Sequence, residues 1–343
     1  MLRGTLRRAG ASGLRVSPRP MNRRAFLTRS ATLAAAGFCL PQILAAEPGA
    51  APTKPSRALS PRATEFIPLR RGAGYFTGRG GAIGWLASPE ALVVVDTQYA
   101  ETAGLCLAGL PGRSERLVDV VFNTHHHKDH TSGNEVFKKS ARMIVAQKNV
   151  PKLQLRDAER VGDTYKQVFA DTLFDDVWRR ELGDEVVTAQ SVGPAHTGGD
   201  AVVCFERANV VHLGDLVFNR TYPVIDRVGG ADIRGWLAAL ELVAQDFPED
   251  AVLIFSHANA RFGHTGGRPE VLLMRDYLSA LLDRAGKAIA AGQGKDELVR
   301  LGNMPGFDDF HVPPGRGNRL PANLAAAFDE LSGVAAPSGS PLL

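Results

Sequence analysis

The segment that decides the fold reads Thr124-His125-His126-His127-Lys128-Asp129-His130, directly after the apolar run Leu117-Val118-Asp119-Val120-Val121-Phe122. The pattern His-x-His-x-Asp-His gathers three imidazoles and a carboxylate, and this donor set suits zinc or iron more than copper. On an extended backbone His125 and His127 point the same way, while Asp129 and His130 can diverge toward a second centre. The pattern therefore predicts a metal site; the alternative is a solvated polar loop with several histidines by chance.

Further candidate ligands follow short apolar runs or lie in turn-rich loops. His196 lies in the turn-rich segment 194–200, ahead of the strand-like run 201–205. The run Val210-Val211-His212-Leu213-Gly214 ends on Asp215, and the run Ala251-Val252-Leu253-Ile254-Phe255-Ser256 ends on His257. A strand end can present such a side chain rigidly. Five histidines and two aspartates are enough for two metal ions, each with an open position for water or substrate.

These motifs resemble those of the metallo-β-lactamase superfamily over roughly residues 66–301. The resemblance implies an α/β fold, a four-layer αβ/βα sandwich with the metals in a cleft at one edge of its two sheets. It also implies two Zn²⁺ ions per chain and assigns their ligands. The first ion would be held by His125, His127 and His196, the second by Asp129, His130 and His257, and Asp215 would bridge the two.

The last of these ligands departs from the family pattern. The family usually has Pro-Gly-His at this point, whereas this sequence has Phe255-Ser256-His257. His264, in the glycine-rich segment 262–267, is therefore an alternative ligand. We favour His257, because it directly terminates an apolar strand and His264 lies seven residues further along the chain.

The N-terminus has the layout of an export signal. Paired arginines in Met21-Asn22-Arg23-Arg24-Ala25-Phe26-Leu27 precede an apolar stretch over 31–44, and Ala45-Ala46 offers a small-residue cleavage point. This arrangement predicts a twin-arginine signal over residues 1–46, the translocation machinery as a partner, a periplasmic location and no stable membrane anchor. An uncleaved anchor is the alternative. Met21 suits the start of such a signal, so residues 1–20 can lie upstream of the true start codon.

The net charge changes sign when the expected signal is set aside. The whole chain has 40 basic and 36 acidic residues, and residues 1–46 contain eight arginines, no lysine and no acid. Removing those eight leaves 32 basic residues against 36 acidic, a formal net charge of −4. The sequence pI near 9.0 therefore reports mainly the targeting segment. A small-molecule substrate is expected, and nucleic acid is not expected as a partner.

The rest of the chain reads as one domain with two flanking segments. Residues 47–65, rich in Ala and Pro, predict a flexible linker. Within 66–301, strand-like runs alternate with helical periodicity, which indicates an α/β fold. Residues 302–343 predict a C-terminal appendage with one short helix that ends near Leu331.

The predicted metals imply hydrolytic chemistry. Two zinc ions can share a hydroxide that attacks a carbonyl carbon, because coordination lowers the pKa of water to about 7. Asp129 is the expected catalytic residue, since it can both bind the second metal and orient the nucleophile. Other residues can orient the ligands or line the cleft; these candidates are Asp96, Thr131, Asn134, Arg220 and Tyr222.

The sequence does not identify the substrate. The leading hypothesis is an exported hydrolase of an ester, thioester, amide or lactam. A bridging aspartate such as Asp215 resembles the ester- and thioester-cleaving branches of the superfamily, whereas true β-lactamases tend to have Cys or Ser there, so lactam cleavage would be promiscuous. The alternatives are a mononuclear iron dioxygenase acting on persulfides, in which His130 and His257 would bind no metal, and a non-catalytic binding module.

Overall fold

The computed structural model describes residues 64–162, 167–310 and 317–336 of the 343-residue chain. The predicted export signal over 1–46 lies outside the described residues, as does nearly all of the predicted linker over 47–65. Across these described ranges, no helix combines the length and the apolar character needed to cross a membrane.

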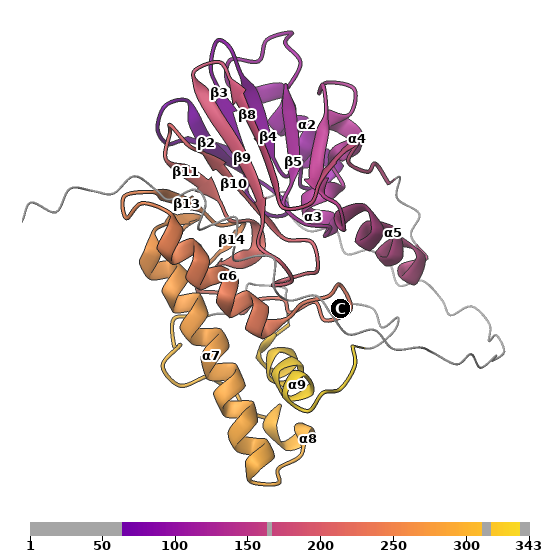
Figure 1. Ribbon diagram of the computed structural model, residues 1–343, viewed down its shortest axis with the longest axis vertical. Helices are drawn as coiled ribbons and strands as arrows, with labels where there is room; N and C mark the ends of the chain where they lie inside the picture. The colour runs from indigo at the N-terminus through magenta and orange to yellow at the C-terminus, as the bar shows by residue number, and fades with distance from the viewer. Residues whose placement is uncertain (1–63, 163–166, 311–316, 337–343) are drawn as a thin grey trace, which may run out of the picture. The chain divides into compact units, whose positions relative to one another are not determined.

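The first sheet has seven strands in chain order, from β1 to β7; its strands β2 to β5 are labelled in Figure 1. The strands from β1 to β4 pair antiparallel, and those from β4 to β7 pair parallel. The central strands are buried on both faces: β4 is wholly apolar, and β5 and β6 are apolar up to their last residues, Asn123 and Gln147. The bounds are β1 Glu65–Pro68, β2 Ala73–Thr77, β3 Ile83–Ala87, β4 Leu92–Val95, β5 Val120–Asn123, β6 Ile144–Gln147 and β7 Thr172–Phe174.

The second sheet has six strands in the order β15-β13-β11-β10-β9-β8. Only β11 and β13 pair parallel in it, and β12 pairs parallel with β14 outside it. The bounds are β8 Val177–Leu182, β9 Glu185–Ser191, β10 Ala201–Phe205, β11 Val210–His212, β12 Phe218–Asn219, β13 Val252–Ile254, β14 His257–Ala258 and β15 Thr265–Gly266.

Helices cover the outer faces of both sheets, which gives four layers. In β4, Val93 and Val95 face the second sheet, while Val94 faces α2 and α4, as the two-residue period of a strand requires. In the second sheet, Val211 of β11 faces α6 and α7. The expected αβ/βα sandwich is therefore present. The helices are α2 Ala100–Gly109, α3 Lys128–Thr131, α4 Asn134–Phe137, α5 Val150–Val161, α6 Ile233–Asp246, α7 Arg268–Ala290, α8 Lys295–Leu298 and α9 Leu320–Leu331, with the 3-10 turn η1 at Gly214–Leu216.

The residues beyond 301 add to the core under the second sheet. Leu320 and Leu324 of α9 are fully buried in the same apolar cluster as residues of α6 and α7. Asn323 Nδ2 donates a hydrogen bond of 3.0 Å to the hydroxyl of Tyr277 in α7. The expected C-terminal helix therefore packs as part of the outer helical layer.

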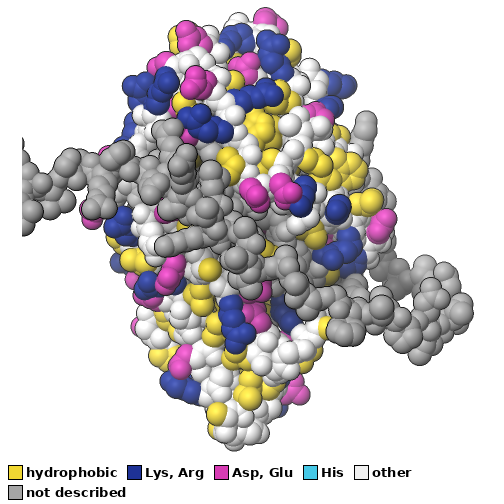
Figure 2. All heavy atoms as spheres, viewed as in Figure 1, with side chains coloured by type: hydrophobic (Ala, Val, Ile, Leu, Met, Phe, Trp, Pro, Cys, Tyr) yellow, Lys and Arg dark blue, Asp and Glu magenta, His cyan; other side chains and the backbone are white. Residues whose placement is uncertain are grey.

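Charge on the described surface is mixed. On the face drawn in Figure 2, Lys and Arg side chains alternate with Asp and Glu side chains, with small hydrophobic areas between them. Ion pairs such as Arg71 with Asp184 at 2.9 Å and Arg179 with Glu206 at 3.1 Å are exposed. Pairs of this kind add little to stability.

Candidate metal centre

The histidine-rich segment follows directly from the end of β5. His127 lies on extended backbone, and the chain turns into the short helix α3 immediately after it. The turn carries Asp129 and His130 to a second position, as the sequence predicts. The β5 strand is buried on both faces, so it fixes where the segment begins.

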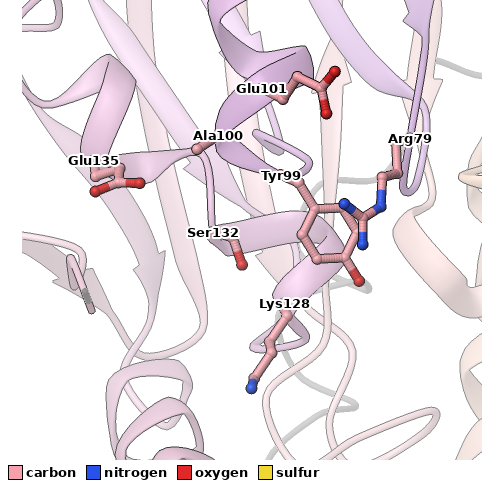
Figure 3. Close-up of a pocket in the computed structure, with 7 residues that line it drawn as sticks. All are labelled: Arg79, Tyr99, Ala100, Glu101, Lys128, Ser132 and Glu135. Atoms are coloured by element: carbon pink, nitrogen blue, oxygen red, sulfur yellow. The ribbon is translucent and has the colours of Figure 1, made fainter. Parts of the chain in front are cut away.

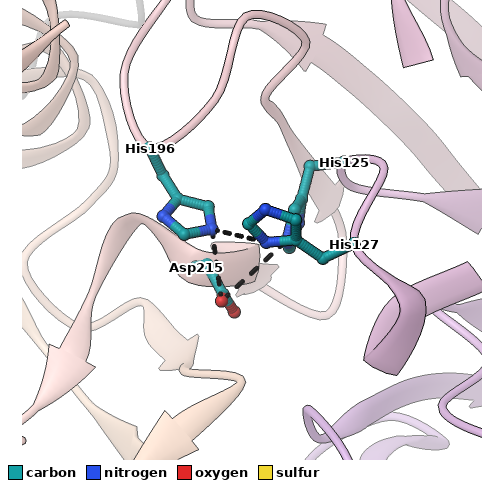
Figure 4. A group of neighbouring side chains, drawn as sticks. All are labelled: His125, His127, His196 and Asp215. Atoms are coloured by element: carbon teal, nitrogen blue, oxygen red, sulfur yellow. Dashed lines mark hydrogen bonds and ion pairs between the residues drawn. The ribbon is translucent and has the colours of Figure 1, made fainter. Parts of the chain in front are cut away.

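The first group of donors consists of three histidines and an aspartate (Figure 4). His127 Nδ1 lies 3.1 Å from both His125 Nε2 and His196 Nε2. Asp215 Oδ2 lies 3.4 Å from His196 Nε2 and 3.9 Å from His125 Nε2. All four donors lie within 4.8 Å of one another, so they can surround one ion.

The second group consists of Asp129, His130 and His257. Asp129 Oδ2 lies 3.2 Å from His257 Nε2 and 3.8 Å from His130 Nε2. The ring of His257 also stacks on Phe218, with centroids 5.2 Å apart. This group is the more open one, because the side chains of Asp129 and His257 are 19% and 15% exposed.

Asp215 lies between the two groups. Its Oδ2 is 3.4 Å from His196 Nε2 and 3.3 Å from His257 Nε2, while its Oδ1 is 3.3 Å from His130 Nε2. It is the central residue of η1, which follows β11 after Leu213. A carboxylate in this place can bridge two cations.

The donor atoms fit metal ions. Burial lowers the pKa of His196 to about 3 and that of His125 well below its ordinary value, so both rings are neutral, as a ligand must be. Among the described residues, His130 Nε2 and Asp215 Oδ1 are buried without an aligned hydrogen bond. Buried polar atoms normally have a partner, and a cation held between the groups would supply it.

In the second group, neighbouring carboxylates favour the protonated forms of both histidines. Burial alone would lower the pKa of His130, but the carboxylates of Asp215, Asp96 and Asp129 raise it well above its ordinary value. The pKa of His257 is also raised, because Asp215 and Asp129 outweigh its burial. An ion that binds here must therefore displace protons.

Asp96 supports both groups from behind. Its Oδ2 accepts hydrogen bonds of 2.8 Å from His130 Nδ1 and from the Thr124 hydroxyl. That hydroxyl lies 3.0 Å from His125 Nδ1 and can accept its proton. The arrangement leaves His125 Nε2 and His130 Nε2 facing the metal positions, and carboxylates in this role fix the orientation of metal-binding imidazoles. Asp96 thus lies where the sequence places an orienting residue.

Thr131 and Asn134 hold the backbone of the motif. The Thr131 hydroxyl donates to His127 O at 3.0 Å. Asn134 exchanges hydrogen bonds with Asn123 at the end of β5. Neither side chain belongs to a group of metal donors among the described residues.

Asp226 is a site residue that the sequence analysis missed. Its Oδ2 lies 3.0 Å from His127 Nε2 and 3.4 Å from His126 Nε2. Burial would raise the pKa of Asp226, but the contacts with His126 and His127 hold it well below its ordinary value. The residue lies 99 positions after His127 in a loop without a motif, so no local pattern indicates it.

Three residues that the sequence suggested for the site lie outside both donor groups: His264, the alternative ligand, and Arg220 and Tyr222, the candidates for the cleft. His264 Nδ1 donates to Phe255 O at 3.0 Å, and His264 belongs to no group of metal donors among the described residues. Arg220 lies over the ring of Phe262 at 4.2 Å and pairs with Glu270 at 3.6 Å. Tyr222 packs in an aromatic cluster with Tyr277 and Phe310.

The loop between β2 and β3 forms one wall of the second group. A Cβ atom at Gly80, where φ is +117°, would lie 2.8 Å from Asp129 O, and one at Gly81 would collide with the ring of His130. Gly81 N donates to Asp129 O at 3.2 Å, and Gln98 Nε2 donates to Gly81 O at 2.6 Å. The glycines therefore permit a close and fixed approach.

Lys128 lies away from the donors, as its place between His127 and Asp129 predicts. It lines a separate hollow of about 310 Å³ together with residues of α2 and the β2–β3 loop (Figure 3). In this hollow the guanidinium of Arg79 lies over the ring of Tyr99, 4.3 Å from its centroid. Glu101 and Glu135 also line it, so its charges are balanced.

Two sheets with helices outside, and a His/Asp metal site at their edge, define a metal-dependent hydrolase. A family model described as the metallo-beta-lactamase superfamily matches residues 76–257. The chain belongs to this superfamily. No curated protein matches the sequence.

Several solved structures share the fold. A metallo-beta-lactamase from Pontibacter korlensis is 18% identical over 63% of this chain and 99% of its own, with a TM-score of 0.54. A metallo-beta-lactamase from Hirschia baltica is 19% identical over 63% and 98%, with a TM-score of 0.51. A double mutant of the sec-alkyl sulfatase PisA1 is 16% identical over 81% of this chain, with a TM-score of 0.62, and this chain spans about half of it (51%). At these identities the likeness shows the fold alone.

Proposed function

We propose that the protein is an exported dinuclear zinc hydrolase that cleaves an ester, thioester, amide or lactam bond in a small molecule. The observation that carries the proposal is the position of Asp215, whose carboxylate lies 3.3–3.4 Å from histidines of both donor groups. Asp215 is buried between two sets of imidazoles that are neutral or can release a proton. A carboxylate in this place suits a pair of cations better than a single cation.

The donor chemistry supports zinc. Five imidazoles and two carboxylates are the nitrogen and oxygen ligands that zinc accepts at catalytic sites, and no thiolate lies among them. His125, His127 and His196 would hold the first ion, and Asp129, His130 and His257 the second, with Asp215 shared. When bound, zinc lowers the pKa of water to about 7 and polarises a carbonyl oxygen.

Asp129 has a further part in the proposal. Its carboxylate is partly exposed, beside His257 at 3.2 Å, whereas the shared carboxylate, Asp215, is buried. An exposed carboxylate at the open side can accept a hydrogen bond from an attacking water molecule and aim it at the substrate. We therefore assign the orientation of the nucleophile to Asp129.

The competing hypothesis is a mononuclear iron dioxygenase acting on persulfides. That chemistry would need one ion, and it gives no role to His130 and His257 as ligands. Both rings lie within 3.3 Å of Asp215, a position that favours a second ion.

Metal analysis of the purified protein tests the proposal. About two zinc ions per chain are expected, with activity on a panel of ester, thioester, amide and β-lactam substrates that chelator removes and zinc restores. Recovery of one iron per chain, with zinc unable to restore activity, would overturn it.

Export by the twin-arginine route is part of the same proposal, and it rests on residues 21–46. Replacing both Arg23 and Arg24 by Lys should trap the precursor in the cytoplasm, because the signal is read through both guanidinium groups. Fractionation of cells and immunoblotting would detect it. Normal periplasmic accumulation of the double variant would contradict the twin-arginine route.

A further inference from the structure

The loop between β12 and α6 binds two imidazoles of the first group on the side that faces away from the metal position. Val224 O accepts a hydrogen bond of 2.8 Å from His196 Nδ1. Asp226 Oδ2 accepts one of 3.0 Å from His127 Nε2. The nitrogens that face the other donors are His196 Nε2 and His127 Nδ1. One stretch of three residues, 224–226, thus holds the outer nitrogen of two ligands.

The carboxylate of Asp226 is buried and fixed in place. It is fully buried, and its Oδ1 accepts a hydrogen bond of 2.7 Å from Gly229 N. A side chain at Gly229 would collide with this carboxylate and would come within 2.8 Å of His126 Cε1. The backbone oxygen of Asp226 accepts a further hydrogen bond of 2.8 Å from Ala231 N. The loop therefore leaves the carboxylate no room to turn away from His127.

We propose that Asp226 is a positioning residue for the first metal ion. Its carboxylate fixes the proton of His127 on Nε2, which leaves Nδ1 as the donor to the metal and sets the plane of the ring. His126, which is almost fully buried, packs beside the carboxylate with Nε2 at 3.4 Å and shields it from water. The inference rests on the proposed metal centre and not on the identity of the substrate.

Asp226 acts on one ion, in contrast to Asp96. Asp96 reaches His125 of the first group through Thr124, and it binds His130 of the second group directly. Asp226 contacts His127 and its neighbour His126 but no donor of the second group among the described residues. Loss of Asp226 should therefore weaken one ion selectively.

A third ion is a competing interpretation of the same residues. His126, His127 and Asp226 together offer three donors within 4.8 Å. We favour the positioning role because Oδ2 of Asp226 already accepts from His127 Nε2 and Oδ1 from Gly229 N, so both oxygens have partners. The two interpretations differ in the number of ions that the protein binds.

Metal titration of the full-length protein, prepared metal-free, tests the inference. Zinc affinity is measured by competition with a chelating indicator, and the Co²⁺ form is followed by its absorption spectrum. Asp226→Ala should weaken one of the two zinc sites by about 10–100-fold, leave the other unchanged and shift part of the Co²⁺ spectrum. Asp226→Asn, which keeps an oxygen acceptor, should lose less affinity at the same site.

Glu185→Gln is the matched control. Glu185 is a buried carboxylate that accepts backbone hydrogen bonds from Arg207 and Ala208 in the second sheet, away from the metal donors. This variant should bind both ions as the parent protein does. If it lost affinity as Asp226→Ala does, the effect would come from general loosening of the fold and the inference would be overturned.

Three other outcomes would overturn the inference. Asp226→Ala could bind both ions with the affinity of the parent protein, or it could lose both equally. The parent could bind three ions and the variant two, which would make Asp226 a ligand. If Asp226→Ala does not fold without metal, the same titration is made with the near-isosteric Asp226→Asn, and the zinc affinities of its two sites test the inference. A parent protein that binds a single ion would overturn the dinuclear proposal, and the effect of Asp226 on that ion would still be measured.

Discussion

The two donor groups differ in how completely the protein encloses them. In the first group His125 and His196 are fully buried, and their outer nitrogens are bound by Thr124 and by Val224 O. In the second group Asp129 and His257 are partly exposed, and His257 is held by stacking on Phe218. The difference indicates that the first metal position is the more enclosed of the two and that the second is the more accessible to solvent.

The same contrast is present in the charges of the metal-free protein. In the first group burial lowers the pKa of His125 and His196, and only His127, beside Asp226, has a raised pKa; in the second group neighbouring carboxylates raise the pKa of both histidines, His130 and His257. The first group can therefore accept an ion with less proton release than the second. Order of loading, pH response and sensitivity to mutation should all follow from this asymmetry.

The largest effect is expected at Asp129. With metal supplied in excess, so that occupancy is not limiting, Asp129→Asn should lower the turnover rate by about 10²–10⁴, because it removes the charge that orients the nucleophile. Steady-state kinetics beside a measured metal content checks this. Near-normal turnover with both metal sites occupied would show that Asp129 acts only as a ligand. The second donor group would then contain no residue that orients the nucleophile.

His257 and His264 form a matched pair for the second group. His257→Ala should lower bound zinc from two ions to about one per chain, because it leaves the second ion only Asp129 and His130 as ligands of its own beside the shared Asp215. His264→Ala should keep both ions, since its ring is bound to Phe255 O outside the donor groups. Elemental analysis of the two variants decides, and the reverse pattern would assign the ligand to His264.

A change of pH should affect the binding affinities of the two ions to different extents. Protons compete with metal at an imidazole, and a raised pKa means that more of the ring is protonated at a given pH. Affinity for the second ion should therefore fall more steeply as the pH drops from 8 to 6, by about tenfold per pH unit for each proton displaced. Zinc titrations at several pH values test this. Equal slopes for the two ions would contradict the asymmetry.

The smallest effect is expected at Lys128. Although it lies between two ligands in the sequence, it lines the separate hollow beside Arg79 and Tyr99. Lys128→Ala should leave metal content and turnover unchanged and alter the free energy of unfolding by no more than about 0.5 kcal/mol. Kinetics and thermal unfolding measure it; a large loss of turnover would show that this hollow takes part in substrate binding.

The sequence predicts the fold and most of the donor set because the decisive residues are close together or end apolar strands. His125, His127, Asp129 and His130 form one continuous motif, and Asp215 and His257 each come a few residues after the end of an apolar strand, β11 and β13. Asp226 could not be predicted, since its partner His127 is 99 residues away and only the folded loop brings them together. Arg220 follows Asp215 closely in sequence, yet its side chain lies on Phe262 and Glu270, because backbone proximity does not fix side-chain direction.

The close contact at Gly80 and Gly81 has a consequence for protein engineering. A common way to change what an enzyme accepts is to diversify the loops around its active site. Here the β2–β3 loop touches Asp129 and His130 so closely that any larger residue would push against the metal ligands themselves. Libraries built at these two positions should therefore yield metal-poor proteins rather than new specificities, and diversification belongs in other loops.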